Sequence, residues 1–249
     1  MGPTMLGKTF EIVRIDQIHE IVSPTVESLL QPLGFEVQGP LSWLRSVNAP
    51  IRQLFRLEQG KGGALAPSWA LSLDFVPHLS GNEIKWHRTS KSARPDLTVD
   101  MRDRAFDISY SYGPDVIATS APNNFRAAIP KAESFWNEAR SIADLPGAFE
   151  RVKQHLSTGG LGFYNYIQHP LAYAFVLAMN GKPNTAEEEF QRYSQRLSKA
   201  AQKNHASYSL MQAVTLAKRV RLFQQHRAEA ALRGEPHVAS SRTYREQLP

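Results

Sequence analysis

Two basic stretches contain the residue types whose spacing could support recognition chemistry. The first places an aromatic ring among cations, because Lys85 and Trp86 are followed closely by further basic residues. Such interleaving suits stacking on nucleic acid or contact with an acidic protein. The alternative is that Trp86 packs inward and the cations are solvated. The candidate partner-binding residues of this stretch are Trp86, His87, Arg88, Lys91 and Arg94.

The second basic stretch is a helix predicted over about residues 206–232. Residues 191–249 contain 11 Lys and Arg against 3 Asp and Glu, a local balance of +8 in a chain of net charge +6. Arg221 lies close to the apolar stripe of this helix, which favours an acidic partner or a snorkelling side chain. A basic helix binds nucleic acid, an acidic protein or an anionic membrane surface, or is simply solvated. Its candidate partner-binding residues are Lys218, Arg219, Arg221 and Arg227.

The sequence lacks the spacings typical of metal centres and covalent catalysis. None of the eight histidines has another at i+3 or i+4, so a metal site would need distant residues such as Asp74, His78 and His87. There is no cysteine and no GxSxG motif. The glycine-rich segment Thr158–Gly162 lacks the lysine of a phosphate-binding loop. We therefore predict no catalytic residues, no metal ligands and no cofactor.

Length and composition are those of an ordinary globular chain. The 249 residues, 42% of them hydrophobic, suffice for one large domain or two small ones. No run of 18 apolar residues is present, so we expect no membrane span. The absence of cysteine and of a secretory pattern leads us to expect a bacterial cytoplasmic protein.

The elements that would position these residues are strands first and helices later. Trp69, Leu71, Leu73 and Phe75 alternate with small and polar residues, which predicts a central strand over Trp69–Val76 with one packed and one wet face. Similar patterns predict strands at 41–47, 51–59, 83–87 and 106–112, and a strand or a helical turn at 96–101. Gln59–Pro67 is rich in glycine and predicts a mobile hairpin loop.

Helical periodicity begins the chain and dominates its second half. One bent helix or two short ones are expected between about Asp16 and Leu33, ended by Gly34. Further helices are predicted at 132–142, 145–156 and 167–179, the last closed by Asn180-Gly181. Thr185 to Glu188 form a capping box that predicts the start of the next helix.

The change from strand to helix patterns near Ala127 predicts an α+β chain with segregated elements. We expect a mostly antiparallel sheet of four to six strands in the amino-terminal half and a helical bundle in the carboxy-terminal half. The predicted regions are a sheet region (1–127), a helical region packed on it (128–234) and a flexible tail (235–249).

Two resemblances carry expectations of their own. The combination of LLQPLGF, a tryptophan-bearing strand, FRLEQ and WALSLDFVPHL resembles the bacterial domain-of-unknown-function 4304 family over roughly the first half of the chain. That family has no established activity, so the resemblance implies a fold only. The segment Ile167–Arg196 resembles one tetratricopeptide-type helical pair, with Gly181 at the turn and Ala186 and Phe190 in the second helix. Two ordinary antiparallel helices are the alternative.

The sequence is compatible with three functions. The favoured hypothesis is a non-enzymatic binding protein with a protein partner, in an accessory or immunity-like role, because a folded sheet and a helical pair come without a catalytic motif. The second is a nucleic-acid binder that uses the basic carboxy-terminal helices. The third is an enzyme whose site is assembled from dispersed residues.

Overall fold

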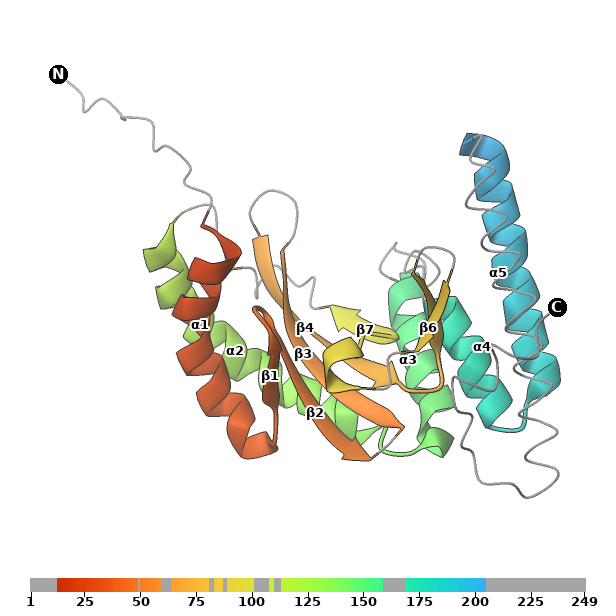
Figure 1. Ribbon diagram of the computed structural model, residues 1–249, viewed down its shortest axis with the longest axis horizontal. Helices are drawn as coiled ribbons and strands as arrows, with labels where there is room; N and C mark the ends of the chain where they lie inside the picture. Colours follow the sequence, from red (N-terminus) through yellow and green to blue (C-terminus); the bar gives the residue numbers. More distant parts are fainter. Residues whose placement is uncertain are drawn as a thin grey trace. The chain divides into compact units, whose positions relative to one another are not determined.

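The computed structural model describes residues 13–48, 50–59, 64–80, 83–86, 89–100, 108–109, 113–158 and 169–204. Within them the chain has the predicted α+β order, with an antiparallel sheet in the amino-terminal half and helices in the carboxy-terminal half (Figure 1). The helices are α1 (Ile15–Leu30), α2 (Pro114–Asn137), α3 (Leu145–Thr158), α4 (His169–Met179) and α5 (Pro183–Asn204). The short 3-10 helices are η1 (Gln31–Leu33), η2 (Ser90–Ser92) and η5 (Ile142–Asp144).

The strands form one large sheet and one hairpin. They are β1 (Glu36–Gly39), β2 (Ser42–Asn48), β3 (Ile51–Gln59), β4 (Ala64–Leu73), β5 (Pro77–Ser80), β6 (Glu83–Trp86), β7 (Leu97–Asp100) and β8 (Ile108–Ser109). The large sheet has the order β1-β2-β3-β4-β7, and β8 pairs antiparallel with β4. The separate β5–β6 hairpin is also antiparallel. β1 is therefore an outer strand of the large sheet.

The chain divides into two compact units, each assembled from separate segments. The first comprises Met1–Val47, Arg52–Leu71 and Thr98–Asn137, and the second comprises Asn48–Ile51, Ser72–Leu97 and Glu138–Pro249. The region boundary expected near Ala127 falls within α2, which is continuous from Pro114 to Asn137. The division into sheet region, helical region and tail stays a prediction.

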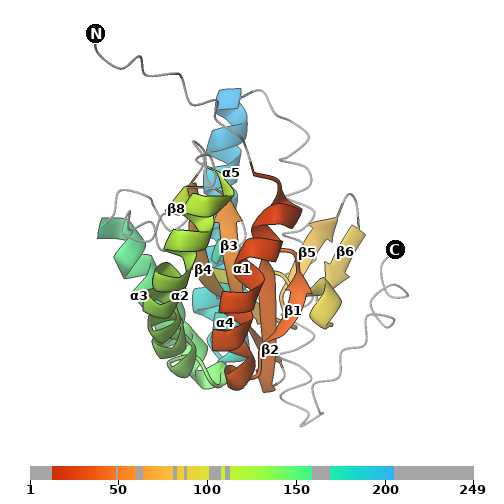
Figure 2. The ribbon, with the colours of Figure 1, turned by 90° about the vertical axis from the view of Figure 1, so that its left-hand side faces the viewer.

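The core of the first unit lies between the large sheet and the helices α1 and α2. α1 packs against α2, and both lie on one face of the sheet (Figure 2). Aromatic rings fill this layer: Phe55 of β3 contacts Trp43 of β2 and Phe125 of α2. Each buried ring of this kind contributes roughly 1.5–3 kcal/mol through apolar burial. The predicted packed face of β3 is confirmed, since Phe55 and Leu57 are buried and Arg56 is only half-buried.

The prediction of a half-wet central strand is wrong for β4. Leu71 and Leu73 are buried as expected, but Ser68, Ala70 and Ser72 of the opposite face are also 0% exposed. An inner strand that is covered on both faces does not need alternating apolar and polar residues. Small side chains can be buried in it as well as large ones. The small side chains of this face were mistaken for a solvated surface.

β4 also begins earlier than predicted. It starts at Ala64, so residues 64–67 of the expected hairpin loop belong to the strand, Pro67 included. The loop was predicted from the glycines of this segment, which lie at positions 60, 62 and 63, before the strand begins. At the other end the strand stops at Leu73, and Asp74 and Phe75 form a turn. The segment 96–101, left open between strand and helix, contains the strand β7.

α1 is one helix that continues through Pro24 and passes into η1. Its N-cap is Arg14, and the Arg14 backbone N–H donates to Oε1 of Gln17 at 3.1 Å. Gly34 ends the helical segment with φ of +83°, a conformation that glycine adopts without steric cost. The predicted stop at Gly34 is thus confirmed.

α2 differs most from its prediction. The expected helix at 132–142 forms only as the last part of a helix that begins at Pro114, and it ends at Asn137. Pro122 and Pro130 lie inside α2, and internal prolines normally interrupt a helix. They masked the periodicity of its buried residues, which are Ile117, Ala121, Phe125, Ala128, Ile129, Ala132 and Trp136.

The second unit contains the helices α3, α4 and α5, of which α4 packs against both of the others. Gly181, with φ of +70°, ends α4 as expected, and the Lys182 N–H donates to the Leu177 carbonyl at 3.0 Å. α5 begins at Pro183, two residues before the predicted capping box, because proline is well suited to the first position of a helix. Ala186 and Phe190 are buried, as a helical pair requires. The tetratricopeptide resemblance itself stays a prediction.

Candidate functional site

The basic residues predicted to bind a partner are only partly within the described chain. Trp86 is the last residue of β6, and its side chain lies outside the described residues, as do His87 and Arg88. The four basic residues of the last predicted helix, Lys218, Arg219, Arg221 and Arg227, also lie outside them. Lys91 and Arg94 are described, and both are exposed.

Two hydrogen bonds to buried side chains hold the backbone near Lys91 and Arg94. The Arg94 N–H donates to Oγ of the buried Ser72 at 3.3 Å, and the buried Asp96 carboxylate accepts from the Leu73 N–H at 2.6 Å. The backbone is therefore anchored while the two cations face solvent. This arrangement is compatible with both interpretations of the first basic stretch, so its role in partner binding stays a prediction.

A search of the described residues finds no group of three or more His, Asp or Glu side chains placed to hold a metal ion. Asp74 is described, but the side chains of His78 and His87 are not, so the dispersed site considered from the sequence lies outside the described part. No described helix is both long and apolar enough to pass through a lipid bilayer.

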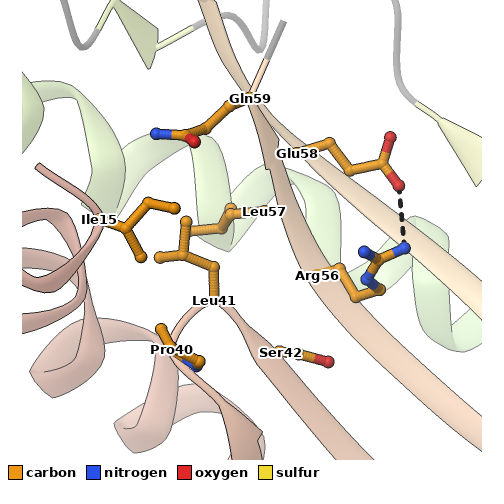
Figure 3. Close-up of a pocket in the computed structure, with 8 residues that line it drawn as sticks. All are labelled: Ile15, Pro40, Leu41, Ser42, Arg56, Leu57, Glu58 and Gln59. Atoms are coloured by element: carbon orange, nitrogen blue, oxygen red, sulfur yellow. Dashed lines mark hydrogen bonds and ion pairs between the residues drawn. The ribbon is translucent and has the colours of Figure 1, made fainter. Parts of the chain in front are cut away.

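Two surface hollows lie at the β1–β2 hairpin, and we call this region, with the residues that line both hollows, the hairpin surface. The first hollow has a volume of about 600 Å³. In Figure 3 the side chains of Ile15, Leu41 and Leu57 point toward one another and form its apolar part. Arg56 and Glu58 point to the other side of β3, where their ion pair spans 3.2 Å. The hollow is lined by Ile15, Pro40, Leu41, Ser42, Arg56, Leu57, Glu58 and Gln59.

The second hollow has a volume of about 440 Å³ and lies between the carboxy-terminal end of α1 and the start of β1. Val37 and Trp43 are its apolar lining residues from the two strands, and they are direct partners in the β1–β2 register. Glu27 of α1 and Glu36 of β1 add carboxylates. The complete lining is Glu27, Gln31, Gly34, Phe35, Glu36, Val37 and Trp43.

Each hollow is lined by an exposed apolar side chain, whose burial in a complex would be energetically favourable. Among the described residues, the large hydrophobic side chains exposed to solvent are Ile15 at 47%, Val37 at 51% and Val116 at 37%. Ile15 lines the first hollow and Val37 the second, whereas Val116 lies on α2 and lines neither. Single exposed hydrophobic residues are ordinary on protein surfaces. Two of them, however, lie in hollows at the two ends of one outer strand, which makes the hairpin surface the candidate site.

A half-buried arginine holds the hairpin surface to the core. The Arg45 guanidinium of β2 donates to Oε1 of Gln53 and to the Leu33 carbonyl, both at 2.7 Å. The same guanidinium lies 4.8 Å from the centre of the Phe35 ring and 5.6 Å from that of Trp136, within range of cation–π attraction. We call this group the Arg45 clamp. It connects β2, β3, α2 and the turn after α1 beside the second hollow, which Phe35 lines.

A second charged group lies among the helices of the second unit. Glu189 of α5 is only 3% exposed, and its Oε1 is 2.7 Å from Arg192 and 3.3 Å from Lys153 Nζ of α3. The Tyr173 hydroxyl of α4 donates to the Glu150 carboxylate, and Lys153 Nζ lies 5.3 Å from the Tyr173 ring. We call these residues the Glu189 cluster. Each charge in it has an opposite charge beside it, which is typical of a tie between helices.

The electrostatics of the second unit show one further effect of burial. Burial raises the pKa of Tyr193 above its ordinary value of 10.0, because the phenolate loses solvation in a packed environment. Tyr193 lies on α5 one turn after Glu189 and is 7% exposed. Its phenol is therefore neutral over the physiological range, and we assign it to packing.

Sequence reasoning missed the hairpin surface. Ile15 falls on the same helical face of α1 as the buried residues Ile18, Val22, Val26 and Leu30, so its position in the sequence indicates core packing. Ile15 is nevertheless 47% exposed as the first residue of α1, which helical periodicity alone does not reveal. Val37 lies in a four-residue strand between Gly34 and Pro40, where no periodicity could be measured.

Comparison with known proteins provides no relative for this chain: no protein-family model matches it, and neither a curated protein nor a solved structure is detectably similar.

Proposed function

We propose that this protein is a binding protein that contacts another protein through the hairpin surface. The observation that carries the proposal is the placement of Ile15 and Val37, which are both about half exposed and line hollows at the two ends of β1. Association would remove these side chains from water, and apolar burial is the main driving force of protein–protein contact.

The lining of the two hollows favours binding over catalysis. No histidine or lysine lines either of them, and Ser42, the hydroxyl residue of the first hollow, donates to Gln38 at 2.8 Å. Nucleophilic chemistry at Ser42 would need a base within hydrogen-bond reach of its hydroxyl, and Gln38 is not a base. Backbone edges and shallow apolar hollows instead suit a protein partner. An accessory or immunity-like role in the bacterial cytoplasm belongs to this proposal.

Site-specific photocrosslinking in cells tests the proposal directly. A benzophenone amino acid would replace Val37 or Ile15 in separate variants of the full chain. Val116 is the matched control, since it is also an exposed hydrophobic residue of the first unit but lines neither hollow. We expect discrete protein adducts from positions 37 and 15 and none from position 116. Equal adduct patterns at all three positions, or none at 37 and 15, would contradict the proposal.

A substitution series supplies the second arm. Val37→Asp and Ile15→Asp place a carboxylate where an apolar contact is expected, which should weaken the captured complex by about tenfold or more per site. Val116→Asp should leave it within about twofold. The measurement is competition of each variant with the wild-type chain for the crosslinked partner.

A further inference from the structure

We infer that the partner presents an extended segment that carries Lys or Arg and pairs with β1 as an added strand. This inference rests on the proposed function and names the chemistry of the partner. It follows from three features of the hairpin surface: an outer strand, an exposed apolar residue on that strand, and carboxylates beside it without cations.

The backbone of β1 supplies the first feature. β1 pairs with β2 through the register Glu36↔Leu44, Val37↔Trp43 and Gly39↔Ser42, and no other described strand pairs with it. An outer strand offers backbone donors and acceptors to a further strand, which is the basis of recognition by strand addition. The β1–β2 ladder is short and irregular between Val37 and Gly39, so a partner of a few residues is sufficient to cover it.

Val37 supplies the second feature. Its side chain is 51% exposed in the second hollow, beside the buried Trp43. In a paired strand, side chains on the same face lie opposite each other at about 4.5–5.5 Å between Cβ atoms. A β-branched or other apolar residue of the partner opposite Val37 would therefore extend the layer that Trp43 and Phe55 begin.

The carboxylates supply the third feature. Glu27 and Glu36 line the second hollow from α1 and β1, and no basic residue lines it. Neither carboxylate forms an ion pair within the described residues; Glu27 accepts a long hydrogen bond of 3.4 Å from Gln31. The nearby cation, Arg45, is held in its clamp by Gln53 and the Leu33 carbonyl. A partner with Lys or Arg next to its apolar residue would match this charge.

Peptide selection on the intact protein tests the inference. The probe is a phage-displayed library of random dodecapeptides, selected on the immobilised full chain. We expect enriched peptides to combine a β-branched or aromatic residue with Lys or Arg within two positions of it. Their binding, measured by biolayer interferometry with synthetic peptides, should weaken between low and high salt because exposed charge pairs are screened.

Charge reversal on the protein provides the matched comparison. The double variant Glu27→Lys/Glu36→Lys should bind the enriched peptides about tenfold or more weakly. Glu20→Lys is the control, since Glu20 is an exposed glutamate of α1 that lines neither hollow, and it should change the affinity by less than about twofold. Circular dichroism and the urea midpoint verify that each variant is folded.

The outcomes separate this inference from the proposed function. Peptides that depend on Val37 but are indifferent to Glu27 and Glu36 would overturn the basic partner while the hairpin surface stands. Self-association of the chain that the charge reversal abolishes, seen by analytical ultracentrifugation, would make a second copy the occupant and would likewise overturn it. A library from which no peptide binds the hairpin surface would overturn it as well, whereas the photocrosslinking result decides the proposed function on its own.

Discussion

The Arg45 clamp and the Glu189 cluster place a charged side chain in packed surroundings by different means. The Arg45 guanidinium donates to the Gln53 side chain and the Leu33 carbonyl and lies against the Phe35 and Trp136 rings. Glu189 is matched by the opposite charges of Lys153 and Arg192. A guanidinium is weakly hydrated and stacks on aromatic faces, whereas a buried carboxylate needs strong donors to replace water. Neutral acceptors and aromatic rings therefore contribute to holding Arg45, whereas Lys153 and Arg192 contribute to holding Glu189.

The largest loss of stability is expected from removing the Trp136 ring, which belongs both to the Arg45 clamp and to the hydrophobic core. Trp136 is 0% exposed, contacts the Phe35 ring at 4.8 Å between centroids, and donates from Nε1 to the Ala70 carbonyl at 3.2 Å. Trp136→Ala should lower the free energy of unfolding by about 3–5 kcal/mol, measured by urea titration. Trp136→Phe keeps a ring for Arg45 and should cost clearly less. Equal losses in the two variants would show that the hydrogen bond, and not the stack, dominates.

An intermediate effect is expected in the Glu189 cluster. Glu189→Gln keeps the shape of the side chain but leaves Lys153 and Arg192 facing a neutral amide, which should cost about 1–3 kcal/mol in urea unfolding. Glu188→Gln is the matched control, because Glu188 is a neighbouring partner of Arg192 at 3.7 Å with a side chain 64% exposed. Its loss should stay below about 1 kcal/mol. Similar losses at the two positions would contradict the importance of burial.

A smaller effect sharpens the comparison at alkaline pH. Because burial raises the pKa of Tyr193 above 10.0, the unfolded chain loses this phenolic proton at lower pH than the folded chain does. The stability contribution is thus complete below pH 10.0 and is lost as pH rises through the folded-state value. Urea titrations between neutral pH and pH 10.5 should show this decline, and Tyr193→Phe should reduce it. An unchanged decline in the variant would assign it to other groups.

The smallest effect is expected from a buried hydroxyl that lacks the hydrogen-bond partners that Arg45 and Glu189 have. Ser68 Oγ is buried on β4 and has no hydrogen-bond partner within the described residues. Ser68→Ala should leave the stability unchanged or raise it by up to about 1 kcal/mol, because it removes an unsatisfied polar atom. Ser72→Ala on the same strand should lower it by about 1 kcal/mol, since Ser72 Oγ accepts from the Arg94 N–H. A loss at Ser68 equal to that at Ser72 would contradict this difference.

The order of elements was predictable from sequence because strong local patterns carried it. The alternation of β3 and the glycines at 34 and 181 correctly placed a strand and two helix ends. Boundaries that depend on tertiary burial were not predictable. β4 was taken as half-wet because small and polar residues such as Ala70 and Ser72 alternate with large apolar ones. Burial on both faces requires neighbours that no local window contains.

The position of the candidate site was not predictable from the sequence. The sequence favoured a binding protein, and it directed attention to cations such as Lys91 and Arg94, which are exposed in the structure. The hairpin surface depends on where Ile15 and Val37 lie after folding, since each is a single apolar residue of common type. The pairing of Val37 with Trp43, which places it beside a hollow, is a long-range property of the sheet.

The two prolines within α2 have a consequence for how the protein acquires its shape. Proline at 122 and at 130 each removes one intrahelical hydrogen bond, and a helix interior with such residues is costly to form alone. A peptide of residues 114–137 should therefore be largely unstructured in water, unlike a peptide with a regular helical sequence of that length. The seven buried side chains of α2 must therefore pack against α1 and the sheet for the helix to be stable. We therefore expect α2 to be stable only together with its packing against α1 and the sheet.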